Sequence, residues 1–246
     1  MMLDDFRILI DEENQYIVKI DKDFQNHNGI IRKEELQKEF GEVYTHKNHK
    51  FYIFKPSLAD IYNLIERRSQ VMQFKDIGFI ISKTGISKNS KVLEAGTGNG
   101  TLTIFLGLIA KKVYSYEIRE DHYKTAKKNL ELFNLKNVIL RNDDISKGLK
   151  EKDFDVIILD LPEPWKIIPS VKKNLKIGGF FAIYCPNLTQ ITKTIEEAKK
   201  QELKVIETKE LIERTWIIEN DKILRPDNKE LFTHTAFILF LRKIKD

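Results

Sequence analysis

The sequence has very little cysteine and no long apolar run. Cys185 is the only cysteine in 246 residues, so an intramolecular disulfide cannot form and a zinc site of several thiolates cannot be assembled. No run of about 18 apolar residues occurs, and residues 1–10 lack the basic start and apolar stretch of a signal peptide. We therefore expect a cytoplasmic protein that does not enter a membrane.

Charge of one sign is not in large excess either. The chain has 42 Lys and Arg against 37 Asp and Glu, a formal net charge of +5. Residues 1–60 hold 9 basic and 12 acidic side chains, net −3, so residues 61–246 hold 33 and 25, net +8. This excess is compatible with a nucleic-acid partner without requiring one, and it lies in the later part of the chain.

Two patterns divide the chain. Up to residue 55, short apolar stretches separated by turns indicate strands. After Pro56, apolar residues at helical spacing predict a short helix that ends near Arg67 and Arg68. We therefore expect a small β domain over residues 1–60 and a second domain over residues 61–246. The strands expected in the first domain are residues 7–10, 16–20 and 50–54, with a turn at 26–29.

Strands and helices alternate from residue 91 onward, which is typical of a parallel sheet covered by helices. The expected strands are residues 91–94, 113–117, 138–140, 155–159, 180–184, 205–213 and 235–242. The expected helices are residues 101–110, 121–133 and 188–201. The pattern predicts an α/β fold with a Rossmann-like sheet.

A glycine-rich loop, Glu94-Ala95-Gly96-Thr97-Gly98-Asn99-Gly100, joins the first of these strands to a helix. Its glycines permit a tight turn and let a ligand lie against the backbone, while the free N–H groups at the helix start favour an anionic group. Glu117 lies 19 residues after Gly98, at the end of the next strand, where a carboxylate can accept both hydroxyls of a ribose. The pair predicts a nucleotide-like cofactor; the alternative is a tight turn in an ordinary βα unit.

The GxGxG spacing resembles that of the class I S-adenosylmethionine methyltransferases, over roughly residues 70–245. In that class, the glycine loop and the acidic residue at its start hold the methionine part of the cofactor. The acidic residue at the end of the next strand holds the ribose. The resemblance implies S-adenosylmethionine as cofactor. For Asp144, a turn or helix-start role is the alternative to a contact with the cofactor's adenine. The cofactor-binding residues it implies are Gln70, Glu94, Gly96, Thr97, Gly98, Asn99, Gly100, Thr101, Glu117, Asp144 and Asp160.

A second segment, Asp160-Leu161-Pro162-Glu163-Pro164-Trp165, follows the strand expected at 155–159. The strand delivers Asp160 to its carboxyl end, where ligands bind in open α/β sheets, and we expect the prolines and tryptophan to stiffen a loop there. This segment resembles the tRNA (adenine-N1)-methyltransferases that act on T-loop adenosines, a resemblance that spans nearly the whole chain. Other segments that carry it are Arg67–Val71, Lys75–Gly78, Gln190, Arg225-Pro226 and His234–Phe237.

The resemblance implies transfer of a methyl group to N1 of a T-loop adenosine in tRNA by a homotetramer. Asp160 is the predicted catalytic residue, because a fixed carboxylate can accept a hydrogen bond from the adenine amino group as positive charge develops. Its alternative is a role in ordering its own loop. The predicted tRNA contacts are Arg67, Arg68, Gln73, Phe74, Pro162, Trp165 and His234.

Some points stay open. Gln73 and Phe74 stand where the family usually has a Tyr-Pro pair, so Phe74 either stacks on the target base or belongs to the core. His234 either forms a structural hydrogen bond or faces the pocket. The other histidines have no ligand spacing, so no metal is predicted. The alternative functions are methylation of a corrinoid precursor, whose enzymes generally lack the β domain, and a non-catalytic RNA-binding subunit, which the intact Glu117 and Asp160 disfavour.

Overall fold

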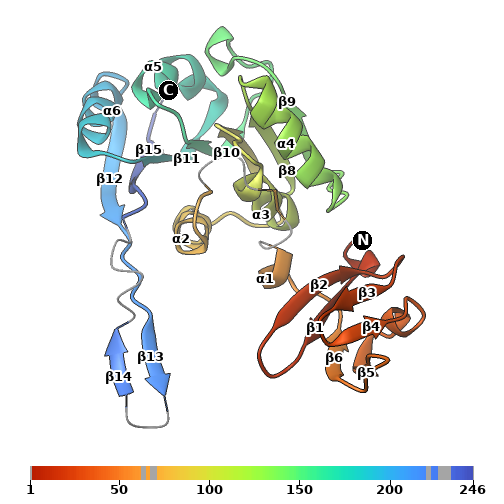
Figure 1. The fold of residues 1–246 in the computed structure, drawn as a ribbon. Helices are drawn as coiled ribbons and strands as arrows, with labels where there is room; N and C mark the ends of the chain where they lie inside the picture. Colours follow the sequence, from red (N-terminus) through yellow and green to blue (C-terminus); the bar gives the residue numbers. More distant parts are fainter. Residues whose placement is uncertain (1, 62–64, 67–70, 220–222, 227–233, 246) are drawn as a thin grey trace. The chain divides into compact units, whose positions relative to one another are not determined.

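The computed structural model describes residues 2–61, 65–66, 71–219, 223–226 and 234–245 (Figure 1). The chain divides into two compact units. The first comprises Met1–Arg67 and Lys128–Asn134, and the second comprises Arg68–Lys127 and Leu135–Asp246. The boundary expected from the sequence was residue 60, a few residues before the end of this first segment. The sequence did not predict that residues 128–134 belong to the first unit.

The first unit contains an antiparallel four-stranded sheet of order β2-β1-β6-β5 and a β3-β4 hairpin. Alternate side chains of the sheet, including Leu9, Val43, Phe51 and Ile53, form its core, as a period of two requires when one face is buried. Its elements are η1 (Met2–Asp5), β1 (Phe6–Ile10), β2 (Gln15–Lys19), β3 (Phe24–Asn26), β4 (Gly29–Ile31), η2 (Glu35–Gln37), β5 (Phe40–Tyr44), β6 (Lys50–Phe54) and α1 (Leu58–Ile61).

The second unit is built on a seven-stranded sheet of order β12-β15-β11-β10-β7-β8-β9. Neighbouring strands are parallel from β11 to β9, whereas β15 runs antiparallel to both β11 and β12. The expected Rossmann-like α/β fold is therefore confirmed. The strands are β7 (Lys91–Ala95), β8 (Lys112–Tyr116), β9 (Val138–Arg141), β10 (Phe154–Leu159), β11 (Leu175–Cys185), β12 (Leu203–Glu210) and β15 (Phe237–Lys243), and a separate pair is β13 (Trp216–Glu219) and β14 (Ile223–Pro226).

Helices cover both faces of this sheet (Figure 1). Strand β10 shows why its apolar residues are continuous: Val156 and Ile158 join the core beneath α2 and α3, while Ile157 and Leu159 join the core beneath α5 and α6. The helical elements are α2 (Phe74–Thr84), α3 (Thr101–Ile109), α4 (Glu120–Glu131), η3 (Ile145–Lys147), α5 (Pro164–Val171), η4 (Lys172–Asn174) and α6 (Leu188–Lys200).

Several elements differ from the sequence-based expectation. The stiff loop expected after Asp160 is wrong beyond Glu163, because α5 begins at Pro164, and proline suits the first turn of a helix, where its missing N–H costs nothing. Helix α2, strand β5 and the β13-β14 pair were not expected. Of the helix predicted after Pro56, α1 ends at Ile61, and most of the rest lies outside the described residues. Within the described part of the chain, no helix is long and apolar enough to span a membrane.

Candidate active site

The glycine loop leaves β7 at Ala95 and turns into α3 beside the end of β10. Gly96 has φ +92°, and a Cβ there would lie 1.9 Å from the Asp160 carbonyl oxygen. The Asp160 N–H donates to the Ala95 carbonyl at 2.9 Å. Glycine at position 96 therefore allows the loop and the Asp160 backbone to approach each other, which sets Asp160 against the loop.

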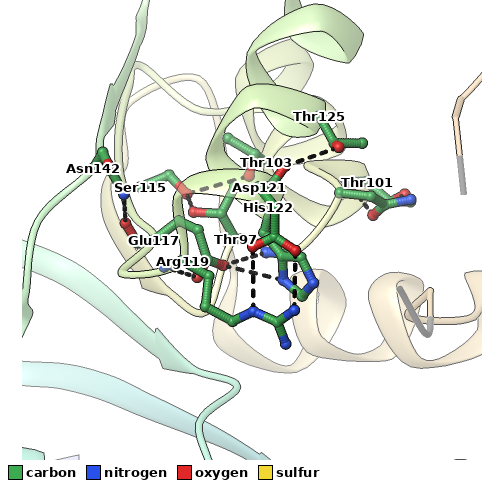
Figure 2. A network of polar contacts seen from close by, with 12 residues as sticks. Thr97, Thr101, Thr103, Ser115, Glu117, Arg119, Asp121, His122, Thr125 and Asn142 are labelled. Atoms are coloured by element: carbon green, nitrogen blue, oxygen red, sulfur yellow. Dashed lines mark hydrogen bonds and ion pairs between the residues drawn. The ribbon is translucent and has the colours of Figure 1, made fainter. Parts of the chain in front are cut away.

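Glu117 follows β8 and reaches across to the same loop (Figure 2). Its Oε2 accepts the Gly98 N–H at 2.9 Å and its Oε1 accepts the Arg119 N–H at 2.9 Å. The Nδ1 of His122 lies 3.9 Å from Oε2, and the Asn142 amide donates to the Glu117 carbonyl at 2.8 Å. Each carboxylate oxygen keeps an unused lone pair, so Glu117 is held in one orientation and can still accept from a ligand.

A cavity of about 360 Å³ brings Glu117 and Asp160 together. No side chain of the described residues donates a hydrogen bond to the Asp160 carboxylate. Burial, and then the nearby Glu117 charge, raises the pKa of Asp160 to about 7. Such a carboxylate has capacity for a donor brought by a ligand. The other lining residues are Val71, Met72, Gly96, Gly98, Ile118, Arg119, His122, Leu161, Pro162, Tyr184, Pro186 and Thr235.

A second cavity of about 360 Å³ shares Gly96, Glu117 and Pro162 with the first. Asp144 lines it, and so do Ile118 and Ile145. The Asp144 carboxylate accepts the Ser146 N–H at 2.9 Å, a bond that caps η3. The Ser146 hydroxyl, and then this N–H, hold the pKa of Asp144 below its ordinary value. Asp144 thus has the predicted helix-start role and also faces a cavity.

Other polar residues predicted to bind the cofactor point into the protein. Glu94 is 1% exposed and accepts the hydroxyls of Thr103 at 2.6 Å and Ser115 at 2.8 Å. Burial raises the pKa of Glu94 to about 8 although these hydroxyls lower it. The Thr97 hydroxyl lies 2.6 Å from that of Ser115 (Figure 2). Neither Glu94 nor Thr97 lines either cavity, so their contacts order the loop from below.

The same holds for the end of the loop. Asn99 Oδ1 accepts both the N–H and the hydroxyl of Thr101, at 3.2 and 2.9 Å, which fixes the first turn of α3. Gly100, with φ +86°, would place a Cβ 3.3 Å from the Ala126 Cα. Neither Asn99 nor Thr101 lines the cavities. Contact of Glu94, Thr97, Asn99 and Thr101 side chains with a cofactor stays a prediction without support from this geometry.

The predicted tRNA-binding residues are dispersed. Pro162 lines both cavities, but Trp165 lies in the first turn of α5, with the Lys193 ammonium 5.1 Å from its ring centroid. Phe74 is 42% exposed and packs edge-on against Phe105, with 5.5 Å between the ring centroids. The exposed Gln73 precedes α2. Predicted residues outside the described part of the chain are Arg67, Arg68 and Gln70.

His234 has a structural hydrogen-bonding role in this structure. Its Nδ1 lies 2.6 Å from Glu210 Oε1 and its Nε2 lies 2.8 Å from the Pro186 carbonyl oxygen. The Pro186 carbonyl and then the Glu210 carboxylate raise the pKa of His234, because both acceptors favour the doubly protonated ring. His234 thereby ties the start of β15 to the segment after β11, while its neighbour Thr235 lines the first cavity.

Sequence reasoning missed two groups of cavity residues. Tyr184 donates its hydroxyl proton to Asp76 at 2.9 Å, a contact between positions 108 residues apart that no local pattern reveals. Met72 and His122 also line the cavity without a sequence signal. Lys75, Asp76 and Thr235 lie in segments that carry the family resemblance, but those segments indicated no role for them.

Comparison with known proteins identifies related chains. The model of a family described as "tRNA methyltransferase complex GCD14 subunit" matches residues 51–237. A Methanocaldococcus jannaschii protein named tRNA (adenine(57)-N(1)/adenine(58)-N(1))-methyltransferase TrmI is 35% identical over 270 aligned positions, covering 96% of this chain and 94% of that protein.

Solved structures of methyltransferases are also similar to this chain over nearly its whole length. The tRNA (m1A58) methyltransferase TrmI of Aquifex aeolicus is 28% identical with a TM-score of 0.80, covering 98% of this chain and 97% of that one. A Thermotoga maritima structure titled as an S-adenosylmethionine-dependent O-methyltransferase is 31% identical with a TM-score of 0.85, covering 98% and 94%. A precorrin decarboxylase, at 20% identity and a TM-score of 0.59, shares only the fold, over 71% of this chain.

Proposed function

The chain belongs to the family of tRNA (adenine-N1)-methyltransferases, and from that premise we propose that it methylates N1 of an adenosine in the T-loop of tRNA, with S-adenosylmethionine as methyl donor. The observation that carries this proposal is the Asp160 carboxylate: it lines one cavity with the glycine loop and Glu117, and no side chain in the described ranges donates to it. The proposed cofactor site therefore adjoins a carboxylate that can interact with the substrate.

The residues present fit the cofactor. Gly96 lets the loop lie directly against the Asp160 backbone, where a Cβ would collide with the carbonyl oxygen, and Glu117 retains lone pairs for ribose hydroxyls. Asp144 and Ile145 line the adjoining cavity, where the cofactor's adenine would lie. S-adenosylmethionine supplies a methyl group on a positively charged sulfur. Glu94, through Thr103 and Ser115, holds the loop in its binding shape.

The protein must align the base with the methyl donor and stabilise the charge that develops on the base. Adenine N1 already carries a lone pair, so no strong base is needed, and the walls of the cavity hold the base in line for transfer. Positive charge develops on the ring and amino group during transfer. The ionised Asp160 accepts a hydrogen bond from that amino group and stabilises the charge inside the cavity.

Two alternatives are disfavoured by particular observations. The precorrin decarboxylase match covers 71% of this chain, whereas TrmI of M. jannaschii covers 96%. A non-catalytic RNA-binding subunit would not need Gly96, Glu117 and Asp160 assembled around one cavity. Methylation at an oxygen, the activity named for the T. maritima protein, would give a different nucleoside in RNA and is separated by the same experiment.

The test is methylation of bulk tRNA with labelled S-adenosylmethionine, followed by digestion to nucleosides and mass spectrometry. We expect N1-methyladenosine from the wild-type protein and a greatly reduced yield from Asp160→Asn at equal cofactor affinity. Label in a 2′-O-methyl nucleoside would overturn the proposal. So would the absence of transfer to tRNA in a protein that binds the cofactor.

We further propose that the first unit contacts tRNA. It has a groove of about 720 Å³ lined by the aromatic rings of Phe6, Tyr16 and Phe24 and by Lys19 and Lys22. Rings and lysines together suit bases and phosphates. Lys19→Ala and Lys22→Ala should each reduce the slope of log affinity against log salt by about 1 or less. Lys38→Ala, whose ammonium pairs with Glu35 at 2.5 Å, is the control that should leave the slope unchanged.

We also propose that the enzyme is a homotetramer working in the cytoplasm, where its tRNA substrate is found. The two-stranded β13-β14 sheet exposes Trp216 at 53% and Ile218 at 69%, beside Ile212 at 73%. A lone hairpin of this kind is marginal in water, so contact with a second copy would stabilise it. Light scattering should give a tetramer for the wild type and smaller species for Trp216→Ser. A wild-type monomer would contradict this proposal.

A further inference from the structure

Four side chains from three distant segments form a connected polar cluster on the wall of the Asp160 cavity. The Lys75 ammonium donates to Asp76 Oδ1 at 3.1 Å and to the Thr235 hydroxyl at 2.6 Å. The Tyr184 hydroxyl donates to the other oxygen of Asp76 at 2.9 Å. Tyr184 and Thr235 line the cavity, so one side of the cluster faces that cavity.

This cluster is buried and electrically balanced. Asp76 is 0% exposed, and the Lys75 side chain is 12% exposed. A buried carboxylate without a partner is costly, whereas here one ammonium and one phenol satisfy it. Burial, and then the Asp76 charge, raises the pKa of Tyr184 above its ordinary value, so the phenol stays protonated throughout the physiological range.

The donors and acceptors run in one direction. Lys75 has only protons to give, so Asp76 and the Thr235 oxygen must accept from it. The Tyr184 proton is committed to Asp76. The Tyr184 hydroxyl therefore has no proton left for the cavity, and its oxygen can only accept there.

We propose that Lys75 and Asp76 are positioning residues that make the Tyr184 hydroxyl an obligate hydrogen-bond acceptor toward the substrate base. This inference rests on the proposed function and deepens it. An acceptor at this wall favours a base that presents an amino group and disfavours one that presents a carbonyl oxygen there. A 6-amino group has two N–H donors, so Asp160 and Tyr184 can each accept one of them. The polar cluster thus selects adenine over a 6-oxopurine.

A double-mutant cycle tests the proposal. In Asp76→Asn the new amide can donate to Tyr184 and turn its proton toward the cavity. We expect a single-turnover methylation rate lower by about tenfold, the usual worth of one hydrogen bond, with unchanged affinity for S-adenosylmethionine. In a Tyr184→Phe background, Asp76→Asn should change the rate by less than about twofold, because Asp76 acts through the missing hydroxyl. Independent effects that multiply would overturn the proposal, as would an unchanged rate in Asp76→Asn.

If Asp76→Asn does not fold, Thr235→Val provides a second variant. It preserves the volume of the side chain and leaves the charges of Lys75 and Asp76 in place. It should slow transfer and be non-additive with Tyr184→Phe. A transcript with purine riboside at the target position gives an independent readout: removing the amino group should slow wild type more than Tyr184→Phe, and equal slowing would contradict the inference. If wild type methylates no T-loop adenosine, the proposed function fails; if it does and the cycle is additive, only this inference fails.

Discussion

Replacing Asp160 by Asn removes one negative charge and keeps the shape of the side chain. Because no side chain in the described ranges donates to this carboxylate, the substitution breaks no internal hydrogen bond, and the fold should be unaffected. Its backbone N–H still donates to Ala95, so the glycine loop stays in place. The effect is therefore expected on the chemical step alone.

The size of the effect follows from the role assigned to Asp160. Loss of one fixed electrostatic contact to a developing charge costs about 10² to 10³ in rate, roughly 2.7 to 4 kcal/mol. The pKa of Asp160, raised by burial to about 7, adds a pH signature. Only the ionised form carries the charge that stabilises the transition state, so kcat/KM, which reports the free enzyme, should rise about tenfold from pH 6 to pH 8. Asp160→Asn should lack that rise.

Single-turnover methylation with saturating S-adenosylmethionine isolates transfer from product release, and calorimetry measures cofactor affinity separately. The reasoning is refuted if Asp160→Asn keeps more than about a third of the wild-type rate, a change under about 1 kcal/mol. It is equally refuted if the wild-type pH rise persists in the variant.

Other predictions concern the loop and its neighbours. Glu117→Ala should weaken cofactor binding by about 1.5 to 3 kcal/mol, the worth of a hydrogen bond to a charged group, and unchanged calorimetric affinity in a folded variant would remove Glu117 from the site. Gly96→Ala should abolish cofactor binding or folding because its Cβ would lie 1.9 Å from the Asp160 carbonyl oxygen, whereas Gly78→Ala, in open space on α2, should be tolerated in thermal melts. Glu94 has its pKa raised from 4.5 to about 8, so the native state holds a proton that the unfolded state releases, and stability should fall as pH rises between those values. Glu94→Gln should flatten this decline in urea unfolding between pH 5 and pH 8, and an unaltered slope would contradict the buried protonated carboxyl.

The alternation of strands and helices made most of the second unit predictable. The strand predicted at 91–94 is β7, and the helix predicted at 101–110 is α3, because their apolar patterns match the periods of a buried parallel strand and a helix covering it. Helix α5 was missed because Pro162 and Pro164 indicated a loop. The helical spacing of Ile168 and Val171, which face the core, was not recognised.

The candidate site divides in the same way. The glycines and Glu117 carry a local signal, since the turn itself requires Gly96 and the spacing leads to the next strand end. Asp76 and Tyr184 are 108 residues apart in the sequence, and their contact depends on the packing of α2 against β11. No local sequence pattern predicts this contact. The inward orientation of Glu94 could not be predicted either, because the hydroxyls that hold it come from α3 and β8.

The most direct test of the account is to locate the methyl group in the RNA. A tRNA transcript incubated with the protein and S-adenosylmethionine would be cut into fragments and sequenced by mass spectrometry. The account predicts N1-methyladenosine confined to the T-loop, and its loss when the target adenosine is replaced by guanosine. A methyl group on another base, on a ribose oxygen or outside the T-loop would contradict it.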